Sequence, residues 1–128
     1  MASTILSGAT VVVVEGHDDI RKLLAEFLTQ QGAAVIACSK ASEGLEALDQ
    51  NCVDVVLSEL NLPVEDGFQF LRSIRARGPG PSSNARVIAM NSVGSATLRH
   101  RALCAGFDRY LDKPFTPQGL LEAIRSVL

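Results

Sequence analysis

Five short apolar runs rich in β-branched residues alternate with five amphipathic segments along the 128 residues of this chain. A continuous apolar run of this length is typical of a strand buried on both faces. The amphipathic segments repeat apolar residues at intervals of three and four, which indicates helices packed on a sheet. Strict alternation predicts parallel strands joined by right-handed crossovers, with helices on both faces. We therefore expect one α/β domain spanning residues 1–128.

The expected elements can be placed from the residues that begin and end them. Strands are expected at 10–14, 34–37, 53–58, 86–90 and 109–111. A helix is expected after each strand. Capping side chains are expected at Asp18 or Asp19 for the first helix, at Ser39 for the second and at Thr116 for the last. The third helix is expected to start at Gly67, and the fourth to span residues 96–105. Gly32 and Gly106 are expected to end the first and fourth helices.

The charge balance argues against nucleic-acid binding. Twelve basic residues stand against fourteen acidic ones, so the formal charge is -2 and there is no overall basic field. The apolar runs are too short to span a bilayer, and the amino terminus lacks a basic segment followed by a long apolar one. We expect a cytoplasmic protein that contacts neither nucleic acid nor membrane.

The three cysteines, Cys38, Cys52 and Cys104, are scattered and show no paired spacing. An odd number without such spacing predicts neither a disulfide framework nor a zinc site. We interpret them as small core residues.

The third apolar run ends in a carboxylate, Glu59, and Pro63 and an Asp66-Gly67 pair then turn the chain into the next helix. In an open α/β sheet, ligands bind beyond the carboxyl ends of the strands. Glu59 therefore marks the expected functional edge of the molecule.

A set of short motifs recurs in a specific order. They are Val11 to Val14 running into Glu15, Asp19-Ile20-Arg21, Leu62-Pro63, Asp66-Gly67, and the segment 105–115 from Ala105-Gly106 to Lys113-Pro114-Phe115. With these motifs the chain resembles response-regulator receiver domains of two-component signalling over essentially its whole length. The resemblance implies a flavodoxin-like (βα)5 fold, a three-layer sandwich whose parallel five-stranded sheet has the order 2-1-3-4-5.

The resemblance also implies a set of chemical roles. In that family, two acidic residues after the first strand and an Asp ending the third bind Mg²⁺, and that Asp accepts a phosphoryl group. A Ser or Thr ending the fourth strand and a Lys before a Pro hold the phosphate, and an aromatic residue of the fifth strand moves with them. The cation offsets the clustered carboxylates, and cationic and hydrogen-bonding groups stabilise the transferred phosphoryl.

This sequence departs from the family pattern at three of these positions. The phosphoacceptor position is Glu59, the acidic pair is Glu15 followed by Gly16, and the Ser or Thr position is Asn91, followed by Ser92. The fifth strand and its end keep the family residues, namely Tyr110 as the moving aromatic, Lys113 as the phosphate-contacting lysine, and Pro114, for which the resemblance implies a cis peptide bond.

The loss of the second acidic residue weakens the expected magnesium site. The remaining protein donors are Glu15, Glu59 and the backbone carbonyl of Asn61. Mg²⁺ demands near-octahedral geometry at about 2.0–2.1 Å, and a Glu carboxylate reaches a different point from that of an Asp. We therefore expect no bound metal, no other cofactor, no catalytic residue and no enzymatic activity. We expect Lys113 to pair with Glu59, and the Asn91 amide to donate to it.

The favoured interpretation is a receiver-like module that no longer uses aspartyl phosphorylation and acts through protein contacts. The expected partner is a histidine kinase, an output domain or a second copy of the chain. We expect this chain itself to carry no output domain. The resemblance implies a partner face at Leu98, Arg99, Arg101 and Tyr110. A plain solvent-exposed face is an equal alternative for these residues.

Other interpretations stay open. The chain could be a working receiver phosphorylated at Glu59 with weak magnesium support. It could instead be a flavodoxin-like domain that binds a small molecule, although it lacks the glycine-rich phosphate fingerprint. Glu59 and Lys113 could also neutralise each other without any functional output.

Overall fold

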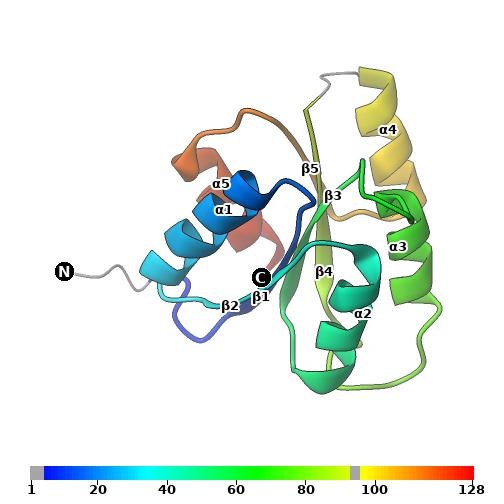
Figure 1. The fold of residues 1–128 in the computed structure, drawn as a ribbon, viewed down its shortest axis with the longest axis horizontal. Helices are drawn as coiled ribbons and strands as arrows, with labels where there is room; N and C mark the ends of the chain where they lie inside the picture. The colour runs from blue at the N-terminus through cyan, green and yellow to red at the C-terminus, as the bar shows by residue number, and fades with distance from the viewer. Residues whose placement is uncertain (1–4, 93–95) are drawn as a thin grey trace.

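Five parallel strands form the sheet in the computed structural model, which describes residues 5–92 and 96–128 (Figure 1). The strands are β1 (Thr10–Val14), β2 (Ala34–Cys38), β3 (Val55–Glu59), β4 (Arg86–Asn91) and β5 (Arg109–Asp112). Their order is β2-β1-β3-β4-β5, and each neighbouring pair is parallel. The predicted flavodoxin-like fold and strand order are therefore confirmed.

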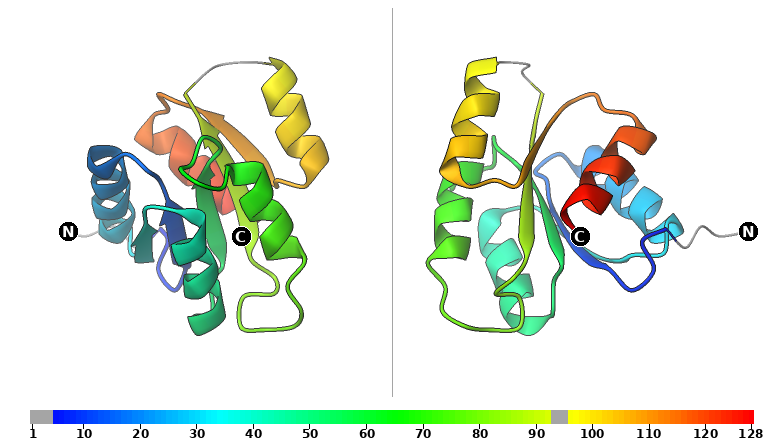
Figure 2. Two further views of the ribbon diagram at one scale, coloured as in Figure 1. Left: turned by 45° about the vertical axis from the view of Figure 1, so that its right-hand side comes forward. Right: turned by 180° about the vertical axis from the view of Figure 1, so that it is seen from behind.

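Helices cover both faces of this sheet. In the described residues they are α1 (Asp18–Gln30), α2 (Ala41–Gln50), α3 (Gly67–Arg75), α4 (Ala96–Ala105) and α5 (Pro117–Val127). Figures 1 and 2 show α1 and α5 on one face and α2, α3 and α4 on the other, which gives the three predicted layers. Within the described ranges, no helix combines the length and apolar character that crossing a membrane would need.

The valines of β1 serve both layers of helices. Val11 and Val13 belong to the core formed with α1 and α5, whereas Val12 and Val14 belong to the core formed with α2, α3 and α4. All four side chains are fully buried. Successive side chains of a strand point to opposite faces, so a strand covered on both faces needs an apolar residue at every position.

The strand bounds differ from expectation by one or two residues. β3 begins at Val55 rather than Val53, and the Val53 N–H donates to the Ser82 hydroxyl at 2.9 Å. Glu59 is the last residue of β3 and lies opposite Met90 in the sheet. The other strands that run one residue further than expected end at Cys38, Asn91 and Asp112.

The predicted cap of α1 is wrong. His17 occupies the capping position, and its Nδ1 accepts from the Ile20 N–H at 3.3 Å. Asp18 and Asp19 are already the first two residues of the helix. There they still place negative charge at the positive end of the helix dipole.

The predicted cap of α2 is also wrong, whereas that of α5 is confirmed. Lys40 precedes α2 and makes no capping hydrogen bond with its side chain. Ser39 instead donates from its N–H and its hydroxyl to Glu43 Oε1, each at 2.7 Å. At α5, Thr116 Oγ1 accepts from the Gly119 N–H at 2.9 Å.

The interpretation of the cysteines as core residues holds for only one of the three. Cys38 is buried at the end of β2, whereas Cys52 and Cys104 are exposed. Cys52 lies in the connection after α2, and Cys104 lies on the outer surface of α4. Burial, reinforced by the charge of Glu43, raises the pKa of the Cys38 thiol to about 11.

Gly67 brings the start of α3 against the end of β3. A Cβ atom at this position would lie 2.7 Å from the Glu59 carbonyl oxygen and 2.8 Å from the Leu60 Cα. Both are backbone atoms, so neither can move aside cheaply. The absence of a side chain at Gly67 therefore lets α3 begin directly beside the residue that ends β3.

Candidate functional site

Four polar side chains gather at the carboxyl edge of the sheet. Glu15 directly follows β1, Glu59 ends β3, Asn91 ends β4 and Lys113 directly follows β5. Glu15 is 3% exposed, and Glu59 and Asn91 are each 5% exposed. A charged carboxylate is almost never buried to this extent unless it is paired. The partners of these two carboxylates therefore decide what the site can do.

The Lys113 ammonium lies between the two carboxylates. Its Nζ donates to Glu15 Oε1 and to Glu59 Oε2. Charge-assisted hydrogen bonds of this kind are stronger than neutral ones. One cation from the end of β5 thus joins two buried anions from the ends of β1 and β3.

Backbone N–H groups hold the remaining oxygen of each carboxylate. The His17 N–H donates to Glu15 Oε2 and the Asn61 N–H donates to Glu59 Oε1, both at 3.3 Å. All four carboxylate oxygens therefore have a hydrogen-bond partner, as buried polar groups require. Sequence reasoning did not find these donors, because every residue except proline carries a backbone N–H.

The electrostatic environment keeps Lys113 charged. Burial by itself would lower the pKa of the ammonium. The hydrogen bonds that the ammonium donates to Glu15 and Glu59, together with the charges of both carboxylates, outweigh burial and raise the pKa above its ordinary value. The lysine is therefore protonated at neutral pH.

Arg21 is a second cation at this edge, and sequence reasoning assigned it no role. Its Nη1 donates to the Glu15 backbone carbonyl at 2.9 Å, and its Nη2 pairs with Asp18 at 2.6 Å. The sequence feature that could have pointed to Arg21 is a basic residue in the first turn of the helix that follows Glu15. Arg21 thus brings a second positive charge next to the backbone of Glu15.

These residues do not fit the magnesium site that the resemblance implies. Gly16 supplies no carboxylate, and the Lys113 ammonium contacts both remaining acids, Glu15 and Glu59. Mg²⁺ needs an octahedral set of oxygen donors, and an ammonium group has no lone pair to donate. In the part of the chain that the structure describes, no three or more His, Cys, Asp or Glu side chains are grouped to hold a metal ion.

Comparison with known proteins identifies the family of this chain. The family model of the response regulator receiver domain matches residues 11–125. The chain belongs to the response regulator receiver family. It is thus a receiver domain of two-component signalling, and receiver domains interact with histidine kinases and output domains.

The similarity extends to proteins of different lengths. An uncharacterized 14.6 kDa protein of Leptolyngbya boryana is 33% identical, over 95% of this chain and 89% of its own length. The probable transcriptional regulator ycf27 of Guillardia theta is 32% identical over 92% of this chain, which spans only 44% of that relative. Among solved structures, the chemotaxis protein CheY4 of Vibrio cholerae has a TM-score of 0.85 at 26% identity, with 94% of this chain and 98% of CheY4 covered.

Asn91 and Lys113 are two of the residues predicted to contact phosphate, and a backbone hydrogen bond connects them in the receiver domain. The Asn91 carbonyl accepts from the Lys113 N–H at 2.7 Å. The Lys113–Pro114 peptide bond is cis. Ser92, the next residue along from Asn91, is exposed. The lysine backbone is thus held against the end of β4, while its side chain reaches the two carboxylates.

Tyr110 of the receiver domain is buried, with 6% of its surface exposed. Its hydroxyl has no hydrogen bond of normal geometry within the described residues. Burial, followed by the nearby Asp112 carboxylate, raises the pKa of the hydroxyl, while Asn91 and Arg99 act in the opposite direction. The aromatic ring therefore faces inward, in a partly polar environment.

The residues expected on a partner face are divided between interior and surface. Leu98 is partly buried against the core, and Arg99 is exposed. The Arg101 guanidinium lies over the Phe68 ring of α3, 4.9 Å from its centroid. Phe68 in turn makes an edge-to-face contact with Phe107, with 5.8 Å between the ring centroids. Arg101 thus helps to fasten α4 to α3.

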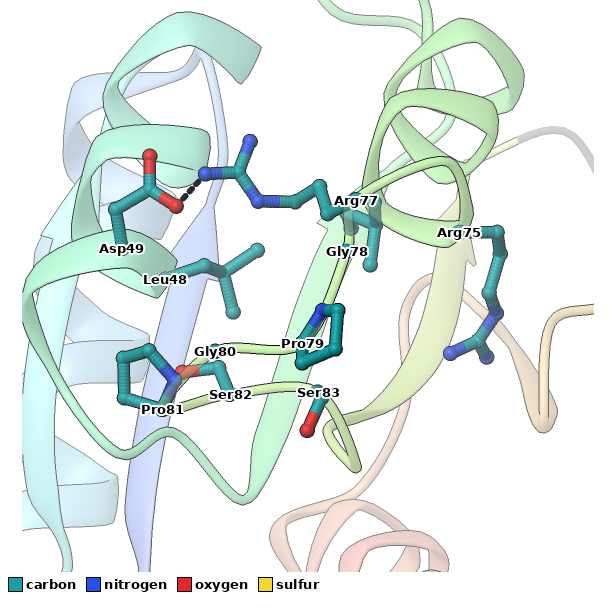
Figure 3. A pocket seen from close by; sticks show the side chains of 11 residues that line it. Leu48, Asp49, Arg75, Arg77, Gly78, Pro79, Gly80, Pro81, Ser82 and Ser83 are labelled. Carbon is teal, nitrogen blue, oxygen red and sulfur yellow. Dashed lines mark ion pairs between the residues drawn. The ribbon is translucent and has the colours of Figure 1, made fainter.

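A cavity of about 380 Å³ lies at the opposite edge of the sheet, where α2 and α3 end against residues 78–83. Figure 3 shows Arg77 reaching across it to pair with Asp49, while Arg75 points away. Arg75 instead pairs with Asp108 at 3.3 Å. The length of the strands separates this cavity from the acidic site, and none of the residues that line the cavity belongs to that site.

Proposed function

We propose that this receiver domain acts without aspartyl phosphorylation, as a protein-binding module of a two-component or phosphorelay pathway. The observation that carries the proposal is the Lys113 ammonium, which contacts both buried carboxylates, Glu15 and Glu59. The family's phosphate-contacting lysine is thus already engaged within the site, on the residue that stands at the acceptor position.

The chemistry of phosphoryl transfer supports this proposal. Transfer relies on metal ions and cationic groups that neutralise the charge developing on the phosphoryl oxygens. Here Gly16 removes one metal ligand, and Lys113 is engaged by two acids. A nucleophilic Glu59 would first have to leave both Lys113 and the Asn61 N–H. Each of these features raises the free-energy barrier to phosphoryl transfer.

The same contacts favour a single, fixed state of the site. The carboxylate of Glu59 holds Lys113, the residue that contacts a transient phosphoryl group in the family. A signal can shift an equilibrium only by its differential affinity for two states. Without phosphorylation, the domain can convey a signal only through the proteins that it binds. A histidine kinase, an output domain or a second copy of the chain are the partner classes we propose.

Intact mass spectrometry after incubation with acetyl phosphate and Mg²⁺ tests the proposal. The native chain should gain no phosphoryl group. A Glu59→Asp, Gly16→Asp variant should gain one, because it restores the acceptor and the second acid on the same scaffold. The new Cβ at residue 16 would lie 3.3 Å from Pro63 Cδ, which is a tight contact with an exposed side chain and so can be accommodated.

Glu46→Asp is the matched control, since it shortens an exposed carboxylate on α2 by the same methylene. It should behave like the native chain. Phosphorylation of the native chain would overturn the proposal, and mapping of the modified residue would show whether Glu59 is an acceptor.

A further inference from the structure

The loop after β3 contains a strained turn at Val64. The Glu65 N–H donates to the Pro63 carbonyl at 2.8 Å, and the φ angle of Val64 between them is 69°. A hydrogen bond from residue i+2 to residue i around a positive φ is the rare and strained form of the γ-turn. A β-branched residue is especially unfavourable in this region of backbone space. Glycine would adopt the same turn without strain.

The Val64 side chain gains nothing from burial in return. It is 97% exposed, the largest exposed fraction among the large hydrophobic side chains of the described residues. An apolar side chain is thus held out into solvent by an unfavourable backbone conformation. Strain of this kind persists where surrounding structure enforces it, and it gathers at sites of ligand contact.

A small pocket lies beside this turn. It has a volume of about 130 Å³ and is lined by residues 40–42 at the start of α2 and residues 63–65 of the loop. Its volume corresponds to roughly four waters at liquid density. It is therefore large enough for the end of one long side chain, and too small for a cofactor.

Glu65, one of the residues that line the pocket, has a buried carboxylate oxygen without a partner. Glu65 Oε2 is buried and has no hydrogen-bond partner in the described part of the chain. A buried acceptor left unpaired is unfavourable, and more so when it belongs to a charged group. Lys40 also lines the pocket, but its side chain is exposed and it makes no ion pair with Glu65 within the described residues. The missing partner of this carboxylate oxygen is a hydrogen-bond donor.

We propose that this pocket receives an arginine side chain of a protein partner, with an apolar residue next to that arginine packing on Val64. A guanidinium offers planar N–H donors that match a carboxylate. The proposal deepens the proposed function and rests on its protein-binding part, but not on the phosphorylation state of Glu59. It places the contact on the loop between β3 and α3, which directly follows the acidic site.

A titration followed by ¹⁵N–¹H NMR tests this proposal on the full chain, with no phosphoryl donor present. The probe is the dipeptide N-acetyl-arginyl-leucinamide, and its matched control replaces arginine by citrulline, which has the same shape without the charge. The arginine probe should produce saturable shifts confined to the amides of residues 40–42 and 64–66. The citrulline probe should bind at least tenfold more weakly.

Two variants separate the charge from the strained turn. Glu65→Gln should weaken binding of the arginine probe at least tenfold. Val64→Gly should raise the melting temperature by relieving strain, yet weaken binding severalfold by removing the apolar contact. Absence of shifts up to about 20 mM probe, where even a millimolar site is occupied, would overturn the proposal. Equal binding by the citrulline probe, or unchanged binding by Glu65→Gln, would do the same.

The outcome is independent of the test of phosphorylation. A failed titration would leave the phosphorylation-independent reading of Glu59 intact. Phosphorylation of the native chain would overturn that reading without changing the shifts that the arginine probe produces.

Discussion

Glu15 and Glu59 are buried with one ammonium between them, so the cost of removing that ammonium can be anticipated. Lys113→Met keeps the length and much of the apolar stem of the side chain, but leaves two buried carboxylates without their shared cation. Breaking a buried ion pair by removing one partner typically costs about 3–5 kcal/mol. We expect the free energy of unfolding, measured by urea denaturation, to fall by about 3 kcal/mol.

Lys22→Met is the matched control, because Lys22 is an exposed lysine of α1. It should change the free energy of unfolding by less than about 0.5 kcal/mol. A Lys113→Met variant as stable as this control would mean that the ammonium contributes no net stability to the site.

The raised pKa of Lys113 also predicts a pH dependence. A group whose pKa is higher in the folded state stabilises the fold fully below its unfolded pKa, which is about 10.4 for lysine. That contribution is lost as the pH rises from this value through the folded pKa. The stability difference between the native chain and Lys113→Met should therefore be constant at neutral pH and shrink in the alkaline range.

Tyr110 also makes the fold less stable as the pH rises, because its pKa is raised in the folded state, where the neutral hydroxyl is favoured. The comparison is therefore made in a Tyr110→Phe background as well, by urea denaturation between neutral pH and pH of about 11. A stability difference that grows towards alkaline pH would contradict the assignment of Lys113 as the charged bridge.

At the scale of the elements, the junction of β3 and α3 depends on a glycine. Gly67→Ala would place a Cβ 2.7 Å from the Glu59 carbonyl oxygen and 2.8 Å from the Leu60 Cα. The helix start or the strand end must shift to remove this overlap. We expect a loss of at least about 2 kcal/mol in the free energy of unfolding, within the range seen for overpacking.

Gly78→Ala is the control for this substitution, because a Cβ there would meet no atom within 4 Å. Residue 78 lies in the connection after α3, and alanine should be neutral or slightly stabilising through the unfolded chain. Thermal unfolding of both variants tests the difference. Equal melting temperatures would show that the β3–α3 junction relaxes without cost.

The elements differ in how far the sequence predicts them. The strands were placed well because β-branched residues at consecutive positions, as in Val11 to Val14, suit a strand buried on both faces. The caps of α1 and α2 were missed because capping depends on which single residue directly precedes the helix. His17 and Lys40 occupy those positions, and neither belongs to the preferred capping types.

The site shows the same division between pattern and geometry. The positions of Glu15, Glu59 and Lys113 at strand ends follow from the sequence, since parallel strands bring their carboxyl ends to one edge. The sharing of one ammonium by both carboxylates does not, because it depends on side-chain conformations at three separate strands. The strain at Val64 likewise needs the backbone angle.

At the scale of the whole molecule, the ion pair of Lys113 with Glu59 connects the end of β3 to the residue that follows β5, and Arg101 of α4 packs on Phe68 of α3. A phosphoryl mimic can change this arrangement only if it binds two states with different affinity, and about 5.5 kcal/mol is needed to invert a 1:99 equilibrium. Beryllofluoride with Mg²⁺ is such a mimic, and the native site offers it neither a free lysine nor a complete metal shell.

We therefore expect beryllofluoride and Mg²⁺ together to leave the ¹⁵N–¹H NMR spectrum of the native chain unchanged. The Glu59→Asp, Gly16→Asp variant should instead show shifts at the site that extend to β5 and α4, because it restores the second acid and shortens by one methylene one of the two side chains that hold Lys113. Mg²⁺ alone, added to both proteins, controls for metal binding without the mimic. Shifts of β5 and α4 in the native chain would show that Lys113 leaves Glu59 on demand, and that the domain still switches.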